Sequence, residues 1–297
     1  MKTLELTTPV AVKNVLFATD FSESSNHALP YALGLASYYK AKLSVVHVID
    51  PTSYQFFASA ESWPAMLECA QEFEKQNTKE LKAQLTGVPH QLLSPTGDIT
   101  DVILRLIHDH QIDLLVLGTH GRHGLKKIFL GSIAEEIFRS SPIPVITVGP
   151  TVPERTNLVR WNRLVFATDL SDESLAAFPH ALSLAQEHRA LLTILHVLAK
   201  PNAGTTVDCE PDTSFVFRRM KELVPAESLL YLAPHYAVEF GDVPEQIVQY
   251  SAENGTDLII LGIRAPQRSL GSVTHFANTT AQQIIANASC PVLTVCG

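Results

Sequence analysis

The residues best suited to chemistry lie between Leu117 and Ser132, where glycines follow an apolar run and lead into a helical pattern. The apolar run ends in Gly118, and two further glycines, Gly121 and Gly124, follow at intervals of three. Glycine lets backbone N–H groups approach a ligand closely, and a helix N-terminus carries partial positive charge. A strand, a glycine-rich loop and a helix start in this order predict an anion site that suits a phosphate group.

The same stretch also permits a purely structural interpretation. Ser132 and Glu135 have the spacing of a capping box, as do Thr279 and Gln282 later in the chain, and such a box closes a helix start without a ligand. Four basic residues accompany the loop glycines: Arg122, His123, Lys126 and Lys127. They either attract a polyphosphate or form a solvated loop face. The sequence has no Walker A motif, and the first predicted strand runs into Asp20 and not into a dinucleotide fingerprint.

Length and composition limit the class of protein. The 297 residues suffice for two ordinary domains, and an apolar fraction of 46% can fill sizeable cores. The net charge of −8 argues against a broad nucleic-acid or anionic membrane surface. The four cysteines lack metal-ligand spacing, the first residues lack the apolar core of a signal peptide, and no apolar run approaches a membrane span. We therefore expect a cytoplasmic protein with no nucleic-acid and no membrane partner.

An internal repeat predicts two similar domains, residues 1–150 and 151–297. The segment VLFATD, which ends at Asp20, recurs as LVFATD, which ends at Asp169, 149 residues later. The segment DLLVLG, which ends at Gly118, recurs as DLIILG 144 residues later. Repeated segments in the same order indicate that one supersecondary pattern occurs twice along the chain.

Each copy of the repeat predicts five strands that alternate with helices. In the first copy the strands are expected near residues 13–19, 42–49, 89–94, 112–118 and 144–149. They are short and almost continuously apolar, as parallel strands covered on both faces should be. Helices are predicted at about 23–40 and 98–110, an aromatic-rich loop at 51–66, and a linker at 150–161. The sequence therefore predicts an α/β protein of two tandem doubly wound five-stranded parallel sheets, with a Rossmann-like fold.

Four residues carry the complete loop pattern G-x2-G-x9-G-[ST]: Gly118, Gly121, Gly131 and Ser132. With the repeated strand and helix order, this pattern resembles the universal stress protein family over nearly the whole chain, as two tandem domains. The resemblance implies that these four residues and Ile133 hold the phosphates of an adenine nucleotide. It also implies that Asp20 contacts the ribose and adenosine side, while the backbone of Val48 reads the adenine edge.

The residues around this predicted site have structural alternatives. Asp20, together with Ser22, can instead cap the first helix. His47, beside Val48, is expected to be a hydrogen-bonded core histidine. His120, inside the glycine loop, is expected to point to solvent.

The second copy keeps only part of the pattern. Asp169, Val197 and Gly262 occupy the matching positions, which predicts a weaker second site. Ala265 and Pro266 replace the second loop glycine, and proline removes an N–H group and restricts φ. Four residues of the longer loop are candidate substitutes for phosphate contacts: Arg264, Arg268, Gly271 and Ser272. We therefore expect this motif to be degenerate.

The pattern of residues favours a binding protein over an enzyme. No paired carboxylates and no Cys–His or Ser–His–Asp spacing indicates a catalytic centre. The resemblance implies an ATP-binding stress-response regulator that takes ATP, ADP or AMP, with Mg²⁺. Slow ATP hydrolysis or phosphotransfer at the same site is one alternative, and an oligomeric scaffold or hydrophobic-ligand carrier without nucleotide is another.

The last strands of the two copies, Val145–Val148 and Val292–Val295, are apolar and lie at sheet edges in such a fold. An exposed apolar edge favours pairing with another strand. We therefore predict an intrachain pseudo-dimer of the two copies, and homo-oligomer formation is left open.

Overall fold

The computed structural model describes residues 12–50, 63–119, 131–153, 160–199, 213–265 and 279–297. The first half contains β1 (Asn14–Ala18), α1 (Glu23–Tyr39), β2 (Lys42–Val46), α3 (Trp63–Gln84), β3 (His90–Leu93), α4 (Ile99–Asp109), β4 (Leu114–Gly118), α5 (Ser132–Ser140) and β5 (Val145–Val148). The second half contains β6 (Arg163–Ala167), α6 (Asp172–Leu175), α7 (Phe178–His188), β7 (Leu191–Leu198), α8 (Ser214–Leu223), the 3-10 helix η1 (Ser228–Leu230), β8 (His235–Phe240), α9 (Val243–Glu253), β9 (Leu258–Ile263), α10 (Thr280–Asn287) and β10 (Val292–Cys296).

The predicted alternation of strands and helices is confirmed, with one local correction. The segment 51–66 was expected to be a loop, but α3 already begins at Trp63. Pro64 fits the first turn of this helix because that turn needs no N–H donor from it. Residues 51–62 lie outside the described residues.

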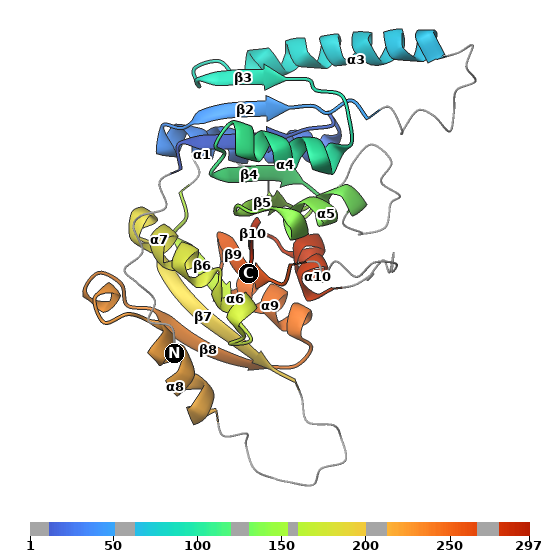
Figure 1. Ribbon diagram of the computed structural model, residues 1–297. Helices are drawn as coiled ribbons and strands as arrows, with labels where there is room; N and C mark the ends of the chain where they lie inside the picture. Colours follow the sequence, from blue (N-terminus) through green and yellow to red (C-terminus); the bar gives the residue numbers. More distant parts are fainter. Residues whose placement is uncertain (1–11, 51–62, 120–130, 154–159, 200–212, 266–278) are drawn as a thin grey trace.

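All ten strands join in one sheet, in the order β3-β2-β1-β4-β5-β10-β9-β6-β7-β8 (Figure 1). Pairing within each half is parallel, as predicted. Between the halves, β5 and β10 pair antiparallel, with Ile146 opposite Leu293 and Val145 opposite Thr294. The predicted pseudo-dimer is confirmed, and its two five-stranded sheets are continuous. Because the two sets of strands run in opposite directions, their carboxyl ends lie at opposite edges of the common sheet.

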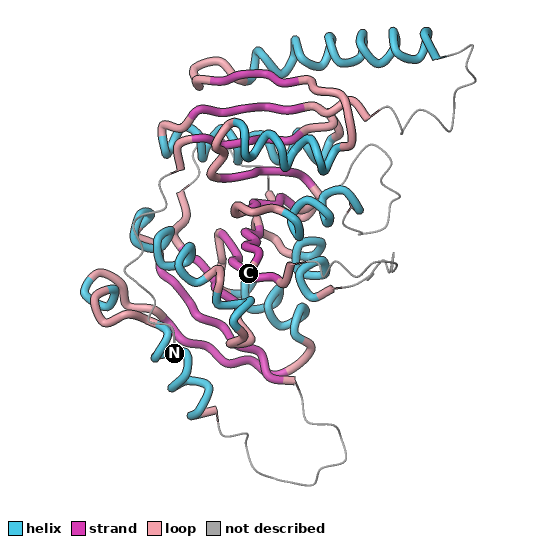
Figure 2. The backbone as a smooth tube through the Cα atoms, viewed as in Figure 1, coloured by secondary structure: helices cyan, strands magenta, loops and turns pink. Residues whose placement is uncertain are grey.

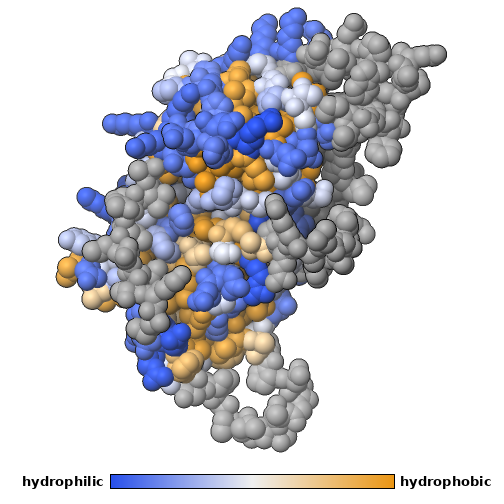
Figure 3. All heavy atoms as spheres, in the orientation of Figure 1, coloured by the Kyte–Doolittle hydropathy of each residue, from blue (hydrophilic) through white to orange (hydrophobic). Residues whose placement is uncertain are grey.

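Helices cover both faces of this sheet (Figure 2). Each face has a buried core that runs through both halves. Phe17 of β1 and Phe166 of β6 belong to one core, which α1, α3, α7 and α8 cover. The neighbouring residues Leu16 and Val165 belong to the other core, under α4, α5, α9 and α10. Successive strand residues point to opposite faces, so apolar residues at both positions produce two cores. On the molecular face seen in Figure 3, apolar side chains gather between the helices.

The last turns of α1 and α7 meet across the two halves. The Tyr39 hydroxyl lies 2.9 Å from Glu187 Oε2 and 3.2 Å from His188 Nε2, and the Tyr38 ring stacks on His188 at 4.2 Å. The backbone N–H of Trp161 donates to His188 Nδ1 at 3.4 Å. Because Nδ1 accepts, the neutral ring carries its proton on Nε2 and donates it to Tyr39, whose hydroxyl donates to Glu187. The contact therefore requires an uncharged histidine.

Burial, assisted by the nearby charge of Arg160, lowers the pKa of His188 from 6.5 to about 4. We expect the free energy of unfolding to decrease as pH falls from 6.5 toward 4, because the unfolded chain binds a proton that the folded chain excludes. The stabilisation that depends on neutral His188 is fully present above pH 6.5, the pKa in the unfolded chain. It is lost as pH falls through the folded-state pKa of about 4. Urea unfolding of the wild type and His188→Gln over this pH range measures it. The variant should show a smaller decrease, and identical decreases would contradict this assignment.

Candidate functional site

In the first half the strand order reverses between β1 and β4, which makes the carboxyl ends of these strands a topological switch point. We call this strand-end region of each half its crevice, after the place where doubly wound sheets bind ligands. Ala18 of β1 pairs with Val46 on one side and with Leu117 on the other. Asp20 follows β1 by two residues, and Gly118 is the last residue of β4. Ligands of doubly wound sheets bind at such a switch point. The fold therefore brings these two predicted site residues to the same crevice.

A short hydrogen-bonded turn holds Asp20 beside the start of α1. Asp20 Oδ1 accepts from the Ser22 N–H at 3.0 Å and from Ser25 Oγ at 2.9 Å. The buried Ser25 hydroxyl also contacts Thr19 Oγ1 at 3.0 Å. Phe21 adopts a left-handed φ of 60°, and its N–H donates to Thr19 Oγ1. Ser22 is the residue that caps α1, so the cap predicted for Asp20 and Ser22 together is provided by Ser22, and Asp20 braces the preceding turn.

Val48 lies just beyond β2, where pairing resumes through a bridge between Ile49 and Thr96. Its side chain is half-buried against the core beneath α4 and α5. The preceding His47 places Nδ1 2.9 Å from the Thr19 carbonyl oxygen, to which it donates. As predicted, His47 is hydrogen-bonded within the fold.

Gly118 has a packing role that its sequence context did not reveal. A Cβ atom at this position would lie 2.5 Å from the Ser24 carbonyl oxygen and 3.0 Å from the Ser25 nitrogen. At Gly262 in the second half, a Cβ atom would meet the carbonyl oxygens of Glu173 and Ser174. The first helix of each half therefore begins directly against the end of a strand, and only glycine permits this approach.

The helix start that follows the glycine loop differs from one prediction. Gly131 is the N-cap of α5, with φ −61° and ψ 140°, and its N–H donates to the Thr119 carbonyl at 2.7 Å. Ser132 is thus the first helical residue, and the capping box predicted for Ser132 and Glu135 is wrong because the cap lies one residue earlier. Ser132 and Ile133 are exposed at the N-terminus of α5. The φ of Gly131 is one that any residue adopts, so a left-handed conformation does not explain this glycine.

Part of the predicted phosphate loop falls outside the described residues. These predictions concern Gly121, Gly124, His120, Arg122, His123, Lys126 and Lys127 in the first half, and Pro266, Arg268, Gly271 and Ser272 in the second. The geometry of the crevice therefore rests on the end of β4 and the start of α5.

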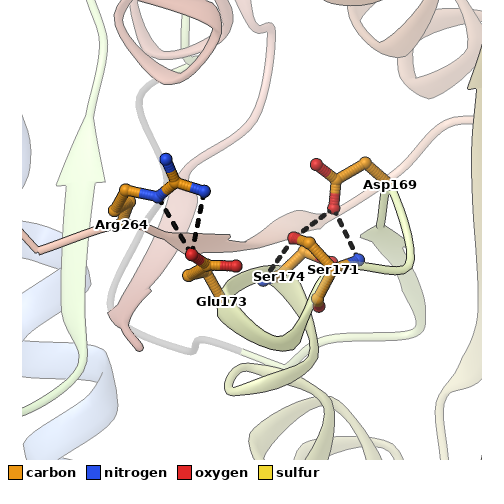
Figure 4. Close-up of polar contacts among 5 residues, drawn as sticks. All are labelled: Asp169, Ser171, Glu173, Ser174 and Arg264. Atoms are coloured by element: carbon orange, nitrogen blue, oxygen red, sulfur yellow. Dashed lines mark hydrogen bonds and ion pairs between the residues drawn. The ribbon is translucent and has the colours of Figure 1, made fainter.

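The second half repeats the turn around its aspartate with a different hydroxyl partner. Asp169 Oδ1 accepts from the Ser171 N–H at 2.9 Å and from Ser171 Oγ (Figure 4). Ser174 Oγ instead lies 2.7 Å from Thr168 Oγ1, and Leu170 has a φ of 65°. Burial raises the pKa of Asp169, but hydrogen bonds from Ser171 and Ser174 outweigh it and leave the pKa below its ordinary value. Asp169 is therefore an ionised and exposed carboxylate.

An ion pair joins α6 to the residue that follows β9 in the second half. Nε and Nη2 of Arg264 both lie 2.9 Å from Glu173 Oε1. Arg264 is one of the residues predicted as phosphate contacts, and its partner Glu173 is not among the predicted site residues. Val197 lies within β7, and the capping box predicted for Thr279 and Gln282 is confirmed at α10.

In the described ranges, no group of three or more His, Cys, Asp and Glu side chains is placed to hold a metal ion. No helix in that same part of the chain is long and apolar enough to cross a bilayer.

The topology defines a tandem doubly wound α/β protein with a switch in strand order in each half. The model of the universal stress protein family matches residues 11–149 and 160–295. The chain therefore belongs to the universal stress protein family and carries two of its domains in tandem, as the sequence resemblance implied.

Individual relatives agree with this membership. A universal stress protein of Methanocaldococcus jannaschii is 28% identical over 138 residues, covering 46% of this chain and 81% of the relative. Universal stress protein A homolog 1 of Coxiella burnetii is 32% identical over 145 residues, covering 46% of this chain and 95% of the relative. A solved universal stress protein from Archaeoglobus fulgidus DSM 4304 covers 95% of this chain and 97% of its own, with a TM-score of 0.67 and 23% identity, which shows the shared fold. A further solved universal stress protein, 18% identical with a TM-score of 0.35, is in complex with cAMP.

Gly118→Ala should destabilise the protein by about 1–3 kcal/mol, because the added methyl group overlaps the backbone of α1. Gly262→Ala should have the same effect in the second half. Thermal and urea unfolding measure both changes. Gly131→Ala serves as the control, because its φ suits alanine, and should change stability less. An unchanged unfolding midpoint for Gly118→Ala would show that the close contact with Ser24 is not needed.

Proposed function

We propose that this protein is a nucleotide-binding stress-response regulator that holds one adenine nucleotide, ATP, ADP or AMP with Mg²⁺, in the crevice of its first half. The observation that carries this proposal is the approach of two chemically different groups to one crevice. Asp20 is anchored at the end of β1, and the start of α5 is tied to the end of β4 by the hydrogen bond from Gly131 to Thr119. One group is an acceptor of hydrogen bonds, and the other is a source of N–H donors.

The two groups suit the two ends of a nucleotide. A carboxylate such as Asp20 accepts hydrogen bonds from ribose hydroxyls. The first N–H groups of α5 have no partner within the helix and lie at the positive end of its dipole, which suits phosphate oxygens. The exposed Ser132 hydroxyl adds a donor at this end. Backbone groups at Val48, past the end of β2, are then on the side of the crevice where the adenine would lie.

The proposal treats nucleotide occupancy as the signal and does not require turnover. Slow ATP hydrolysis is the alternative activity of the same site. Release of ADP by the wild type above the level of a Gly131→Val variant would indicate hydrolysis, whereas equal release would leave binding as the activity.

Asp20→Ala should weaken binding of ATP by about 1.5–3 kcal/mol, because a hydrogen-bonded contact to a charged group is lost. Isothermal titration calorimetry with ATP measures the dissociation constant. Asp169→Ala is the matched control in the second half and should leave the tight site unchanged. An unchanged dissociation constant for Asp20→Ala would limit this residue to bracing the turn before α1.

Binding should be asymmetric, with about one tight ATP site per chain. Gly131→Val should remove nearly all tight binding, because a branched side chain at the N-cap obstructs approach of a phosphate to the start of α5. Calorimetric stoichiometry tests the first expectation, and titration of the variant tests the second. Two equivalent sites in the wild type, or full binding by Gly131→Val, would refute the assignment to the first half.

A further inference from the structure

The two halves share the turn into their first helix, but they differ in charge beside the glycine against which that helix packs. Ser24 follows the turn in the first half, and Glu173 stands 149 residues later at the matching position of the second. Backbone atoms of both residues lie against a glycine, Gly118 at the end of β4 in one half and Gly262 within β9 in the other. A neutral side chain at one crevice is therefore replaced by a carboxylate at the other.

Glu173 is paired with a cation of the second half. Its Oε1 atom accepts both Nε and Nη2 of Arg264, which follows β9, and Figure 4 shows the two side chains turned toward each other. The backbone hydrogen bond at Glu173, followed by the charge of Arg264, lowers the pKa of the carboxyl group. At neutral pH the carboxylate is ionised, and the guanidinium is already paired with it.

A polyphosphate that entered this crevice would meet unfavourable electrostatics. It would have to displace the carboxylate from Arg264, and Glu173 would then remain nearby as an unpaired negative charge. Asp20 and Glu23 of the first half have acidic counterparts in Asp169 and Asp172 of the second. Glu173 is therefore the additional carboxylate of the second half, since Ser24 contributes no charge at the matching position.

We propose that Glu173 excludes nucleoside polyphosphates from the second half. The proposal rests on the proposed nucleotide site of the first half, and it names the residue that makes the two halves differ. Glu173 could have the opposite role and orient Arg264 to bind a phosphate. The NMR experiment below would then show a triphosphate-dependent shift in the wild type.

The first arm of the test transfers the charge to the first half. Calorimetry compares Ser24→Glu with Ser24→Gln, which has a similar size and no charge, and uses ATP and adenosine as probes. Ser24→Glu should weaken ATP binding about ten- to a thousandfold, the range expected for one added like charge near the phosphates. It should leave adenosine binding unchanged, and Ser24→Gln should bind ATP nearly as the wild type does. If both variants weaken ATP binding equally, or if Ser24→Glu weakens adenosine binding as much as ATP binding, the added charge is not the cause and the proposal is overturned.

The second arm removes the charge from the second half. Backbone amide signals of Ser171–Ser174 are followed by NMR in the full chain during titration with inorganic triphosphate. They should stay unchanged in the wild type and shift in Glu173→Gln, because Arg264 is then released. A shift in the wild type, or loss of that shift in Glu173→Gln, would show that the ion pair receives phosphate and would overturn the proposal. No shift in either protein would also overturn it.

The two claims fail separately. The second arm uses inorganic triphosphate, so it tests Glu173 even if calorimetry detects no binding of ATP to the wild type. Absence of ATP binding would contradict the proposed nucleotide site and not the exclusion of anions by Glu173.

Discussion

The antiparallel pairing of β5 with β10 is the interaction on which the arrangement of the whole molecule depends. Both strands are almost entirely buried, and each would present an apolar edge to water if the halves were separate. Their pairing makes one continuous sheet and lets each core extend from one half into the other. It also brings the ends of α1 and α7 together, where Tyr39, Glu187 and a neutral His188 form a shared network.

The same pairing separates the two crevices, because antiparallel halves direct their strand ends to opposite edges of the sheet. Each crevice can then change without disturbing the other. Both halves retain the turn that packs against the core. Phe21 and Leu170 have left-handed φ values there, and a serine hydroxyl donates to Asp20 in one half and to Asp169 in the other. The halves differ at the matching positions Ser24 and Glu173, and only Glu173 carries a charge, which pairs with Arg264.

Much of the fold could be predicted because its signals are local. Buried parallel strands give short apolar runs, and the observed strand limits differ from the predicted ones by only a few residues. The first residue of a helix is less well determined by local sequence. Ser132 and Thr279 each lie three residues before a Glu or Gln that suits a capping box, yet only Thr279 forms one. Gly131 is the N-cap of α5, so Ser132 is already the first helical residue and cannot cap the helix. A cap depends on where the incoming chain is fixed, and the contact between Gly131 and Thr119 is not visible in the sequence.

The sequence by itself determined the repeat, the alternation of strands and helices, and the family, because each depends on residue order over a few dozen positions. The tertiary structure decided how groups distant in sequence share space. It showed that Gly118 and Gly262 are needed for close contact with a helix start, a requirement set by backbone atoms more than 80 residues away in sequence. It also joined Arg264 to Glu173, 91 residues apart. Long-range contacts of this kind have no local pattern, because only the folded chain brings the two partners within bonding distance.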